Sequence, residues 1–221
     1  MIELVKPGSL VSRSDQGQQQ VTGGSGGAWS SSNPFMATIT ASRNLSGPGA
    51  EKEVHHFELD VAGSGISFQP GDSVAVQPSN REEDVEAFAS ILGMDLEQLV
   101  VLAPAAGAPS GASAVSEPVC GWGTVSLRSI LSRHCDIMGV PRRYFFHLLS
   151  FFCHGDDVQR ERLEEFSSVA GRDDLYSYCQ KQGRSFLEVF RDFPAARPPL
   201  HYLLDLIPRI RPRYENCQSP P

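Results

Sequence analysis

The spacing of hydrophobic residues changes twice along this chain, and that change constrains the fold more than any other feature. Between residues 35 and 76, apolar residues recur at every second position, as in half-buried strands. From residue 85 onward they recur at the three- and four-residue spacing of amphipathic helices. After residue 208 a short extended pattern returns. Strands, then helices, then a strand predict an α+β fold.

Three strands are expected ahead of the helices. Apolar and polar residues alternate over 35–42 and again over 56–61, and Gly47-Pro48-Gly49 supplies a turn between these segments. A third strand, Ser73–Val76, follows the turn residues Pro70-Gly71-Asp72. Because no helical pattern separates them, these strands predict an antiparallel sheet or part of a barrel.

The helical block contains seven predicted helices. The first follows Ser79-Asn80, two candidate capping residues, and stops at Gly93, whereas Pro208 ends the last. Residues 103–118 are rich in Ala, Gly, Pro and Ser and predict an irregular loop. Pro141 suits the first position of a helix. The expected helices are 85–92, 127–138, the apolar run after Pro141, 156–169, 172–181, 185–192 and 200–207.

The order of these patterns predicts a domain organisation. Residues 1–32 have too few apolar residues to form a core and predict a disordered leader or linker. Residues 33–80 form the first part of a β-domain, 81–208 an all-helical domain, and 209–221 a short return strand with a tail. Because the return segment is too short to be a domain, a helical insert explains the order better than two independent domains.

Composition excludes some classes of function. The net charge of −7, from 19 basic and 26 acidic residues, argues against a nucleic-acid partner. No window reaches the roughly 20 apolar residues of a membrane span, and no secretory signal is evident, so we expect a cytoplasmic protein without a membrane partner. The widely spaced cysteines predict reduced thiols rather than a zinc site: Cys120, Cys135, Cys153, Cys179 and Cys217.

Short motifs give weak signals when they are taken alone. Gly63-Ser64-Gly65 lacks the third glycine and the following helix of a dinucleotide loop, so a local turn is the better interpretation. His55 and His56 are consecutive in a predicted strand and therefore point to opposite faces. The sequence contains no nucleophile motif of a hydrolase and no phosphate-binding loop of a nucleoside triphosphatase. The alternating arginines 209, 211 and 213 either bind a pyrophosphate or are ordinary surface residues.

Several longer segments, in order, resemble the FAD-binding and connecting region of the NADPH-dependent diflavin reductases. They include NPFMATITASRNLS, HHFELDVAGSGISFQPGDSVAVQPSN and RSFLEVFRDFPAARPPLHYLLDLIPRIRPR, within residues 33–213. The resemblance implies a partial antiparallel FAD-binding β-barrel of the ferredoxin-reductase type, interrupted by an inserted helical connecting domain. It also implies electron transfer from NADPH through FAD and FMN to a protein acceptor. The runs DIMGVPRRYFF and LEEFSS are most similar to the cytosolic family members of iron-sulphur protein assembly, whose acceptor is anamorsin-like.

The resemblance assigns site residues by position. The family motif is an arginine that holds the FAD pyrophosphate, a free position, an aromatic that stacks on the flavin, and a serine. Arg213 and Tyr214 match its first two positions, but Glu215 and Asn216 replace the aromatic and the serine. Arg43 and Arg184 lie where the resemblance puts nucleotide and FAD contacts, although both also suit exposed surface positions.

The sequence holds no match to the other parts of such an enzyme. The remaining barrel strands, the NADPH domain and the FMN domain are missing, so the resemblance implies a truncated region with an incomplete FAD site. Two hypotheses stay open. The chain is either the FAD-binding part of an oxidoreductase or an inert isoform that binds an FMN-domain or iron-sulphur redox partner.

Overall fold

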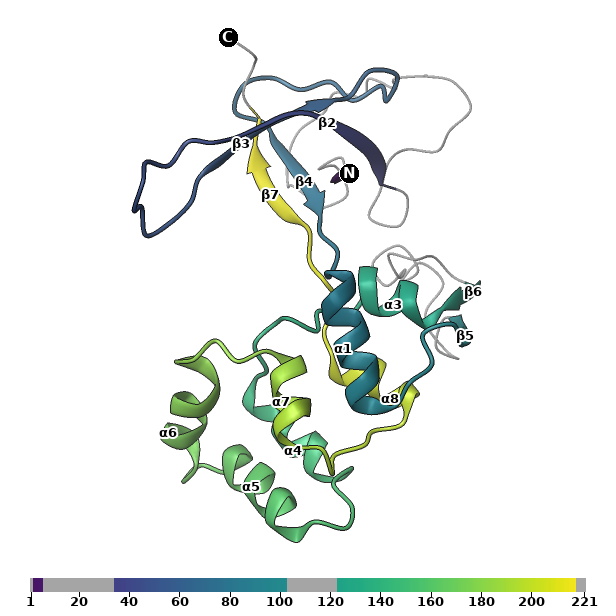
Figure 1. Cartoon of the computed structure of the whole chain (residues 1–221), viewed down its shortest axis with the longest axis vertical. Coiled ribbons are helices and arrows are strands. Elements are labelled where there is room, and N and C mark those ends of the chain that lie inside the picture. Colours follow the sequence, from purple (N-terminus) through teal and green to yellow (C-terminus); the bar gives the residue numbers. More distant parts are fainter. Residues whose placement is uncertain (1, 6–33, 103–122, 218–221) are drawn as a thin grey trace, which may run out of the picture. The chain divides into compact units, whose positions relative to one another are not determined.

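A computed structural model describes residues 2–5, 34–102 and 123–217 (Figure 1). The chain divides into two compact units, each described here by itself. The sheet unit comprises Met1–Pro78 and Arg211–Pro221, and the helical unit comprises Ser79–Ile210. The sheet unit is therefore assembled from two stretches of chain that lie on either side of the helical unit in the sequence.

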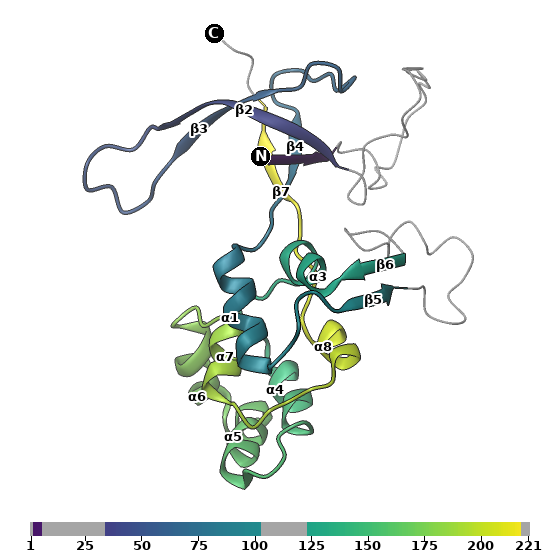
Figure 2. The same ribbon diagram turned by 45° about the vertical axis from the view of Figure 1, so that its right-hand side comes forward.

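The sheet unit contains one five-stranded antiparallel sheet with strand order β3-β2-β1-β4-β7 (Figures 1 and 2). Its strands are β1 (Ile2–Val5), β2 (Phe35–Asn44), β3 (His55–Asp60), β4 (Ser73–Gln77) and β7 (Arg213–Asn216). The three strands expected from the alternation, β2, β3 and β4, are confirmed. Across the described residues β3 and β7 form open edges, so this sheet is not a closed barrel.

β1 corrects the prediction for the amino-terminal residues. The composition of residues 1–32 predicted a disordered leader, but residues 2–5 pair with both β2 and β4 in the centre of the sheet. The prediction averaged over 32 residues and so missed a four-residue run, Ile-Glu-Leu-Val, that is rich in strand-forming residues. The rest of the predicted leader lies outside the described residues.

β2 and β3 form a long hairpin that is anchored at its turn. The amide of Leu45 donates to the carbonyl of Val54 at 2.7 Å, and Gly49 adopts a positive φ of 81°. Ala37 is fully buried while its neighbours on β2 are exposed, as the two-residue period predicts. One face of β2 therefore packs inward.

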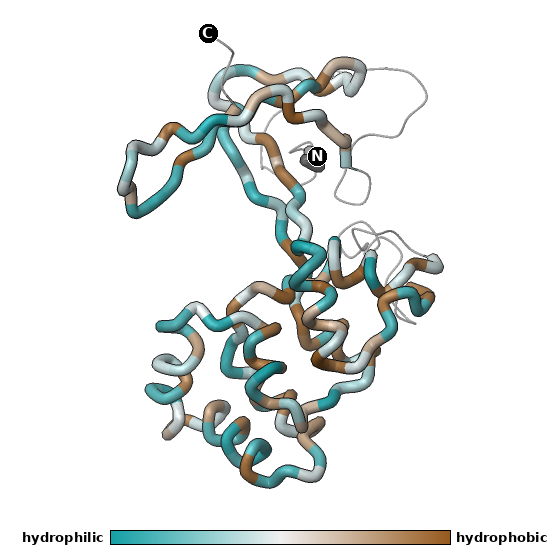
Figure 3. The backbone as a smooth tube through the Cα atoms, viewed as in Figure 1, coloured by the Kyte–Doolittle hydropathy of each residue, from teal (hydrophilic) through white to brown (hydrophobic). Residues whose placement is uncertain are grey.

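The described residues of the helical unit form one hydrophobic core, in which several phenylalanine rings contact one another. Phe145 contacts Phe186 edge-to-face at 4.8 Å, and Phe190 contacts both Phe145 and Phe88. Hydrophobic (brown) segments recur along the tube of this unit in Figure 3. The helices are α1 (Glu82–Leu92), α3 (Leu127–Arg133), α4 (Arg143–Ser150), α5 (Asp157–Ser167), α6 (Arg172–Leu175), which continues into the π-helical turn η1 (Tyr176–Gln180), α7 (Phe186–Asp192) and α8 (Leu200–Leu206).

The ends of two helices show how local sequence sets their boundaries. α1 ends at Gly93, which has a left-handed φ of 67°. At its start Arg81 is the N-cap, and Asn80 instead donates its side-chain amide to the carbonyls of Leu131 and Cys135 at 2.6 and 2.7 Å. Asn80 therefore ties the approach to α1 to the end of α3.

The prediction of an all-helical block is wrong in one region. β5 (Leu99–Leu102) and β6 (Gly123–Ser126) form a two-stranded antiparallel sheet within the helical unit. Val100 and Leu102 pack against the helical core while the alternate residues are exposed. Four-residue strands are too short to show a period, and their pairing partner is distant in sequence. The predicted loop 103–118 lies outside the described residues.

Two helix boundaries also differ from the prediction. The second helix, expected over 127–138, ends at Arg133, and Met138 is exposed rather than part of its apolar face. Pro141 precedes the N-cap Arg142 instead of occupying the first helical position. No helix in the described part of the chain is long and apolar enough to cross a membrane.

Candidate functional site

The candidate site begins where the chain returns to the sheet as β7. Arg213 pairs with Val76, Tyr214 with Ala75 and Asn216 with Ser73, in antiparallel register with β4. In Figures 1 and 2, β7 lies beside β4 although well over 100 residues separate them in the sequence. The sequence predicted a short return strand within 209–221, and the strand itself runs from Arg213 to Asn216. Backbone pairing does not depend on side-chain identity, so the strand continues through residues that depart from the family motif.

A turn fixes the far end of β7. The amide of Cys217 donates to the carbonyl of Asp72 at 2.7 Å, and the amide of Gly71 donates to the carbonyl of Cys217 at 3.1 Å. Gly71 has a φ of 96°, which favours glycine, and the Asp72 carboxylate accepts from the amide of Gln69 at 2.8 Å. Burial, and secondarily the nearby Asp72 carboxylate, raises the pKa of the Cys217 thiol. This thiol is therefore mainly protonated at neutral pH, which lowers its reactivity as a nucleophile.

Strand geometry sorts the β7 side chains onto two faces. Because successive strand residues point to opposite faces, Arg213 and Glu215 share one face and Tyr214 lies on the other. All three are exposed, with Tyr214 at 55%. No ion pair joins Arg213 to another residue in the described ranges. Arg213 thus presents an exposed guanidinium, with a carboxylate two positions away on the same face.

Arg43 is not a neighbour of Arg213 in the sheet. It is exposed near the end of β2, where it pairs with His56 of β3. β1 and β4 separate β2 from β7, and three strand spacings amount to about 14 Å. The structure therefore does not bring these two arginines together around one small group.

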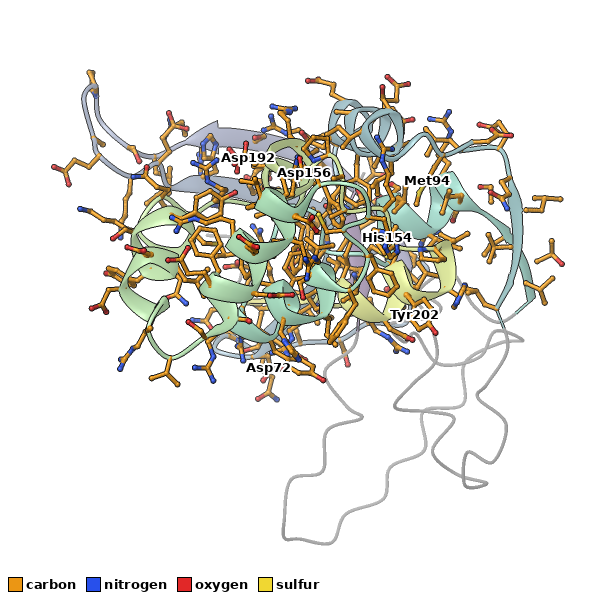
Figure 4. All side chains as sticks on the ribbon, turned by 90° about the horizontal axis from the view of Figure 1, so that it is seen from below. Asp72, Met94, His154, Asp156, Asp192 and Tyr202 are labelled. Atoms are coloured by element: carbon orange, nitrogen blue, oxygen red, sulfur yellow. The ribbon has the colours of Figure 1, made fainter. Side chains whose placement is uncertain are left out.

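Arg184 has its own set of partners in the helical unit. Its Nη1 donates to Oδ2 of Asp192 at 2.5 Å, and its Nε donates to the backbone carbonyl of Tyr178 at 3.2 Å. The guanidinium also lies 4.4 Å from the centre of the Tyr178 ring, whose hydroxyl donates to Asp192 at 2.7 Å. Asp192 is labelled in Figure 4. In this arrangement the Arg184 guanidinium joins the start and end of α7 to η1.

The Tyr178–Arg184–Asp192 cluster was not predicted from the sequence. Burial, followed by the hydrogen bond to Asp192, raises the pKa of the Tyr178 hydroxyl, so this group remains a donor at physiological pH. Burial likewise raises the pKa of the neighbouring Cys179 thiol to about 11. One feature of the sequence could have indicated this cluster: Arg184 lies just before the seven-residue helix Phe186–Asp192, and Asp192 ends it.

The three alternating arginines lie in three different settings. Arg209 belongs to the helical unit, where it makes a β-bridge with Cys135, and Arg211 precedes the strand. Burial, and secondarily the charge of Arg209, lowers the pKa of His134. Of the three, Arg213 alone lies in β7.

The weak motifs have local partners. The Ser64 hydroxyl donates to the carbonyl of Val61 at 2.6 Å and accepts from the amide of Ile66, so Gly63-Ser64-Gly65 forms a local turn. His55 contacts Glu53 and His56 contacts Glu58 separately. Among the described residues no group of three or more His, Cys, Asp or Glu side chains is arranged to hold a metal ion.

Comparison with protein families decides which family this arrangement belongs to. The family model described as FAD binding domain matches residues 28–219, most of the chain. The chain belongs to the FAD-binding domain family. This confirms the resemblance that the sequence motifs indicated. The FAD-binding domain match includes β2, the helical unit and β7.

Curated proteins that are similar in sequence to this chain agree with the assignment to this family. NADPH-dependent diflavin oxidoreductase 1 of Bos taurus is 40% identical over 188 residues, covering 84% of this chain and 30% of that protein. The Arabidopsis thaliana protein of the same name is 35% identical over 184 residues, covering 83% and 29%. NADPH–cytochrome P450 reductase of Oryctolagus cuniculus is 32% identical over 189 residues, covering 85% and 27%. The chain thus spans about 30% of the length of the diflavin oxidoreductases it matches.

The donor set of β7 fits one part of FAD and not the other. The exposed Arg213 guanidinium has the charge and the bidentate geometry that a pyrophosphate requires. Glu215 and Asn216 offer neither an aromatic face nor a hydroxyl to the flavin ring, and the carboxylate opposes negative charge there. Arg213 therefore suits the phosphates of FAD, while the two positions that the resemblance assigns to the flavin ring carry a carboxylate and an amide.

Proposed function

We propose that this chain is the FAD-binding and connecting part of a diflavin oxidoreductase. In this proposal the sheet unit is the first part of the FAD-binding barrel, and the helical unit is the connecting domain inserted into it. The observation that carries the proposal is the pairing of β7 with β4, which returns Arg213 to the sheet that contains β1 to β4. FAD, when bound, supplies the hydride and electron transfer that protein side chains lack.

The wider role follows from the relatives. We propose that the complete enzyme takes electrons from NADPH and passes them through FAD and FMN to a protein acceptor. The names of the relatives, an NADPH-dependent diflavin oxidoreductase and an NADPH–cytochrome P450 reductase, support this route. An iron-sulphur assembly protein of the anamorsin type is the proposed acceptor, and the cytoplasm is the proposed compartment.

Titration of FAD with the purified chain, followed by quenching of flavin fluorescence, tests the proposal. Arg213→Ala should weaken binding by about 10-fold or more, because charge-assisted hydrogen bonds to phosphate contribute about 1.5–3 kcal/mol. Arg211→Ala is the matched control, since Arg211 is exposed, lies outside the strand and should leave affinity unchanged. Equal affinities for the two variants would exclude Arg213 as the pyrophosphate ligand.

A second candidate function is a protein-interaction module without turnover. Glu215 favours it, because a carboxylate stands where the resemblance places a ring-stacking aromatic. Under this alternative the wild-type chain binds no FAD, the double variant Glu215→Phe/Asn216→Ser gains FAD binding, and the flavin-free wild type still captures an isolated FMN domain. FAD binding by the wild type together with hydride transfer from NADPH would exclude it.

A further inference from the structure

The helical unit carries an aromatic groove that the proposed FAD site does not use. The groove lies between the end of α4 and one face of α8 and has a volume of about 400 Å³. Three aromatic rings, two leucines and one carboxylate line it: Leu148, Phe151, Phe152, Tyr202, Asp205 and Leu206. Figure 4 labels Tyr202 on α8. The groove is therefore mostly apolar, with one negative charge.

Several side chains that line this groove are exposed to solvent and are not buried in the helical core. On α8, Leu203 and the following Ile207 are buried in the core, whereas Tyr202 and Asp205 are exposed on another face at i and i+3. Leu206, one position after Asp205, is partly buried and packs against the core at the edge of this face. Phe151 follows the buried α4 residues and is 62% exposed. Large aromatic side chains left in water at a concave site indicate a binding surface.

Two pairs of aromatic rings lie at the groove. Phe152 and Tyr202 are tilted, with their centres 5.1 Å apart, and Phe151 meets His147 edge-to-face at 5.1 Å. Ring faces carry negative electrostatic potential and attract cations. Asp205 is exposed in the same groove, and within the described ranges no cationic side chain pairs with it. Aromatic faces and an unpaired carboxylate therefore favour the same kind of ligand, an organic cation with an apolar stem.

We propose that this groove binds a lysine or arginine side chain, flanked by apolar residues, of a partner protein. A purely apolar ligand would desolvate Asp205 without compensation, and an anionic ligand would be repelled by it. The chain carries a net charge of −7, which favours encounters with basic partners. A volume near 400 Å³ is at the small end of ligand pockets, so it accommodates a few side chains rather than a whole domain.

The test measures binding of two short peptides to the full chain by NMR shift changes. The probe is acetyl-Leu-Lys-Leu-amide, and its matched control replaces lysine with norleucine, which keeps the stem and removes the charge. We expect the lysine peptide to bind about 5- to 10-fold more tightly, with shifts centred on Tyr202 and Leu206. Asp205→Asn should abolish this preference, whereas Asp173→Asn, the same change on α6, should preserve it.

Each result decides the proposal. A preference for lysine that Asp205→Asn removes and Asp173→Asn leaves intact supports it. Equal binding of the two peptides, or no binding of either, would overturn the proposal of a cationic ligand. Butylammonium binding as tightly as the lysine peptide would overturn the proposal of a protein partner and make the groove a small-cation site. Tyr202→Leu, which keeps the apolar volume, should also weaken the preference if the ring face contributes.

Discussion

At the scale of single residues, Arg184 shows how one guanidinium stabilises a bend in the chain. It joins a carboxylate at the end of α7 to a carbonyl and an aromatic face in η1. The ion pair is partly shielded, with side-chain exposures of 29% and 37%. Interactions of this kind contribute more than a fully exposed pair, since solvent screens them less.

Arg184→Ala should lower the free energy of unfolding of the helical unit by about 1–2 kcal/mol, because the ion pair, the carbonyl hydrogen bond and the ring contact disappear together. Urea denaturation followed by circular dichroism measures this change. Arg172→Ala, the loss of an exposed arginine on α6, is the control and should change stability by less than about 0.5 kcal/mol. Unchanged stability with weakened FAD binding would instead make Arg184 a cofactor contact, as the resemblance implied.

At the scale of elements, the sequence predicted strands and helices well where their period was long enough to read. β2 and α1 are ten and eleven residues long, whereas β5 and β6 have four residues each. Short strands depend on a partner that is distant in the sequence, and no local pattern identifies that partner. For the same reason the sequence identified Arg213 but could not supply its pairing with Val76. The sequence also could not predict the partners of Arg184, because these contacts depend on how α7 packs against η1.

The capping box of α7 allows a pH-dependent prediction. Ser185 accepts from the amide of Glu188, and the Glu188 carboxylate accepts from the backbone amide and the hydroxyl of Ser185, which lowers the pKa of Glu188. Ser185→Ala should therefore cost about 1 kcal/mol of stability at pH 7.

The sign of the pH effect follows from the lowered pKa of Glu188. The Glu188 carboxylate stabilises the fold at a pH above 4.5, the pKa of this group in the unfolded chain. This stabilisation is lost as the pH falls through the lower pKa that Glu188 has in the folded chain. The difference in stability between wild type and Ser185→Ala should accordingly be smaller at acid pH than at pH 7. Urea midpoints across this pH range measure it, and a difference that grows on acidification would contradict the assigned hydrogen bonds.

At the scale of the whole molecule, the two units have separate cores. The large buried side chains, including Phe88, Phe146 and Phe190, belong to the helical unit, whereas Ala37 and Ala75 are buried in the sheet unit. Large-to-small substitutions in the core of the helical unit should therefore destabilise the helices more than the sheet.

Phe190→Ala should destabilise the helical unit by about 3–5 kcal/mol, because it removes ring contacts with Phe88 and Phe145 and leaves a cavity. Hydrogen exchange followed by mass spectrometry should show faster exchange in α1, α4 and α7. Amides of β2 and β3 serve as the internal control and should keep their protection. Equal loss of protection in both units would show that they unfold as one cooperative body.

The proposed FAD site depends on a sheet that the chain leaves after β4 and rejoins at β7, which contains Arg213. Nuclear Overhauser effects between backbone protons of the paired strands test this most directly. The account predicts cross-strand effects that join Ala75 to Tyr214 and Ser73 to Asn216. Absence of these effects, or effects that join β7 to a different strand, would contradict the fold and remove the structural basis for the FAD site.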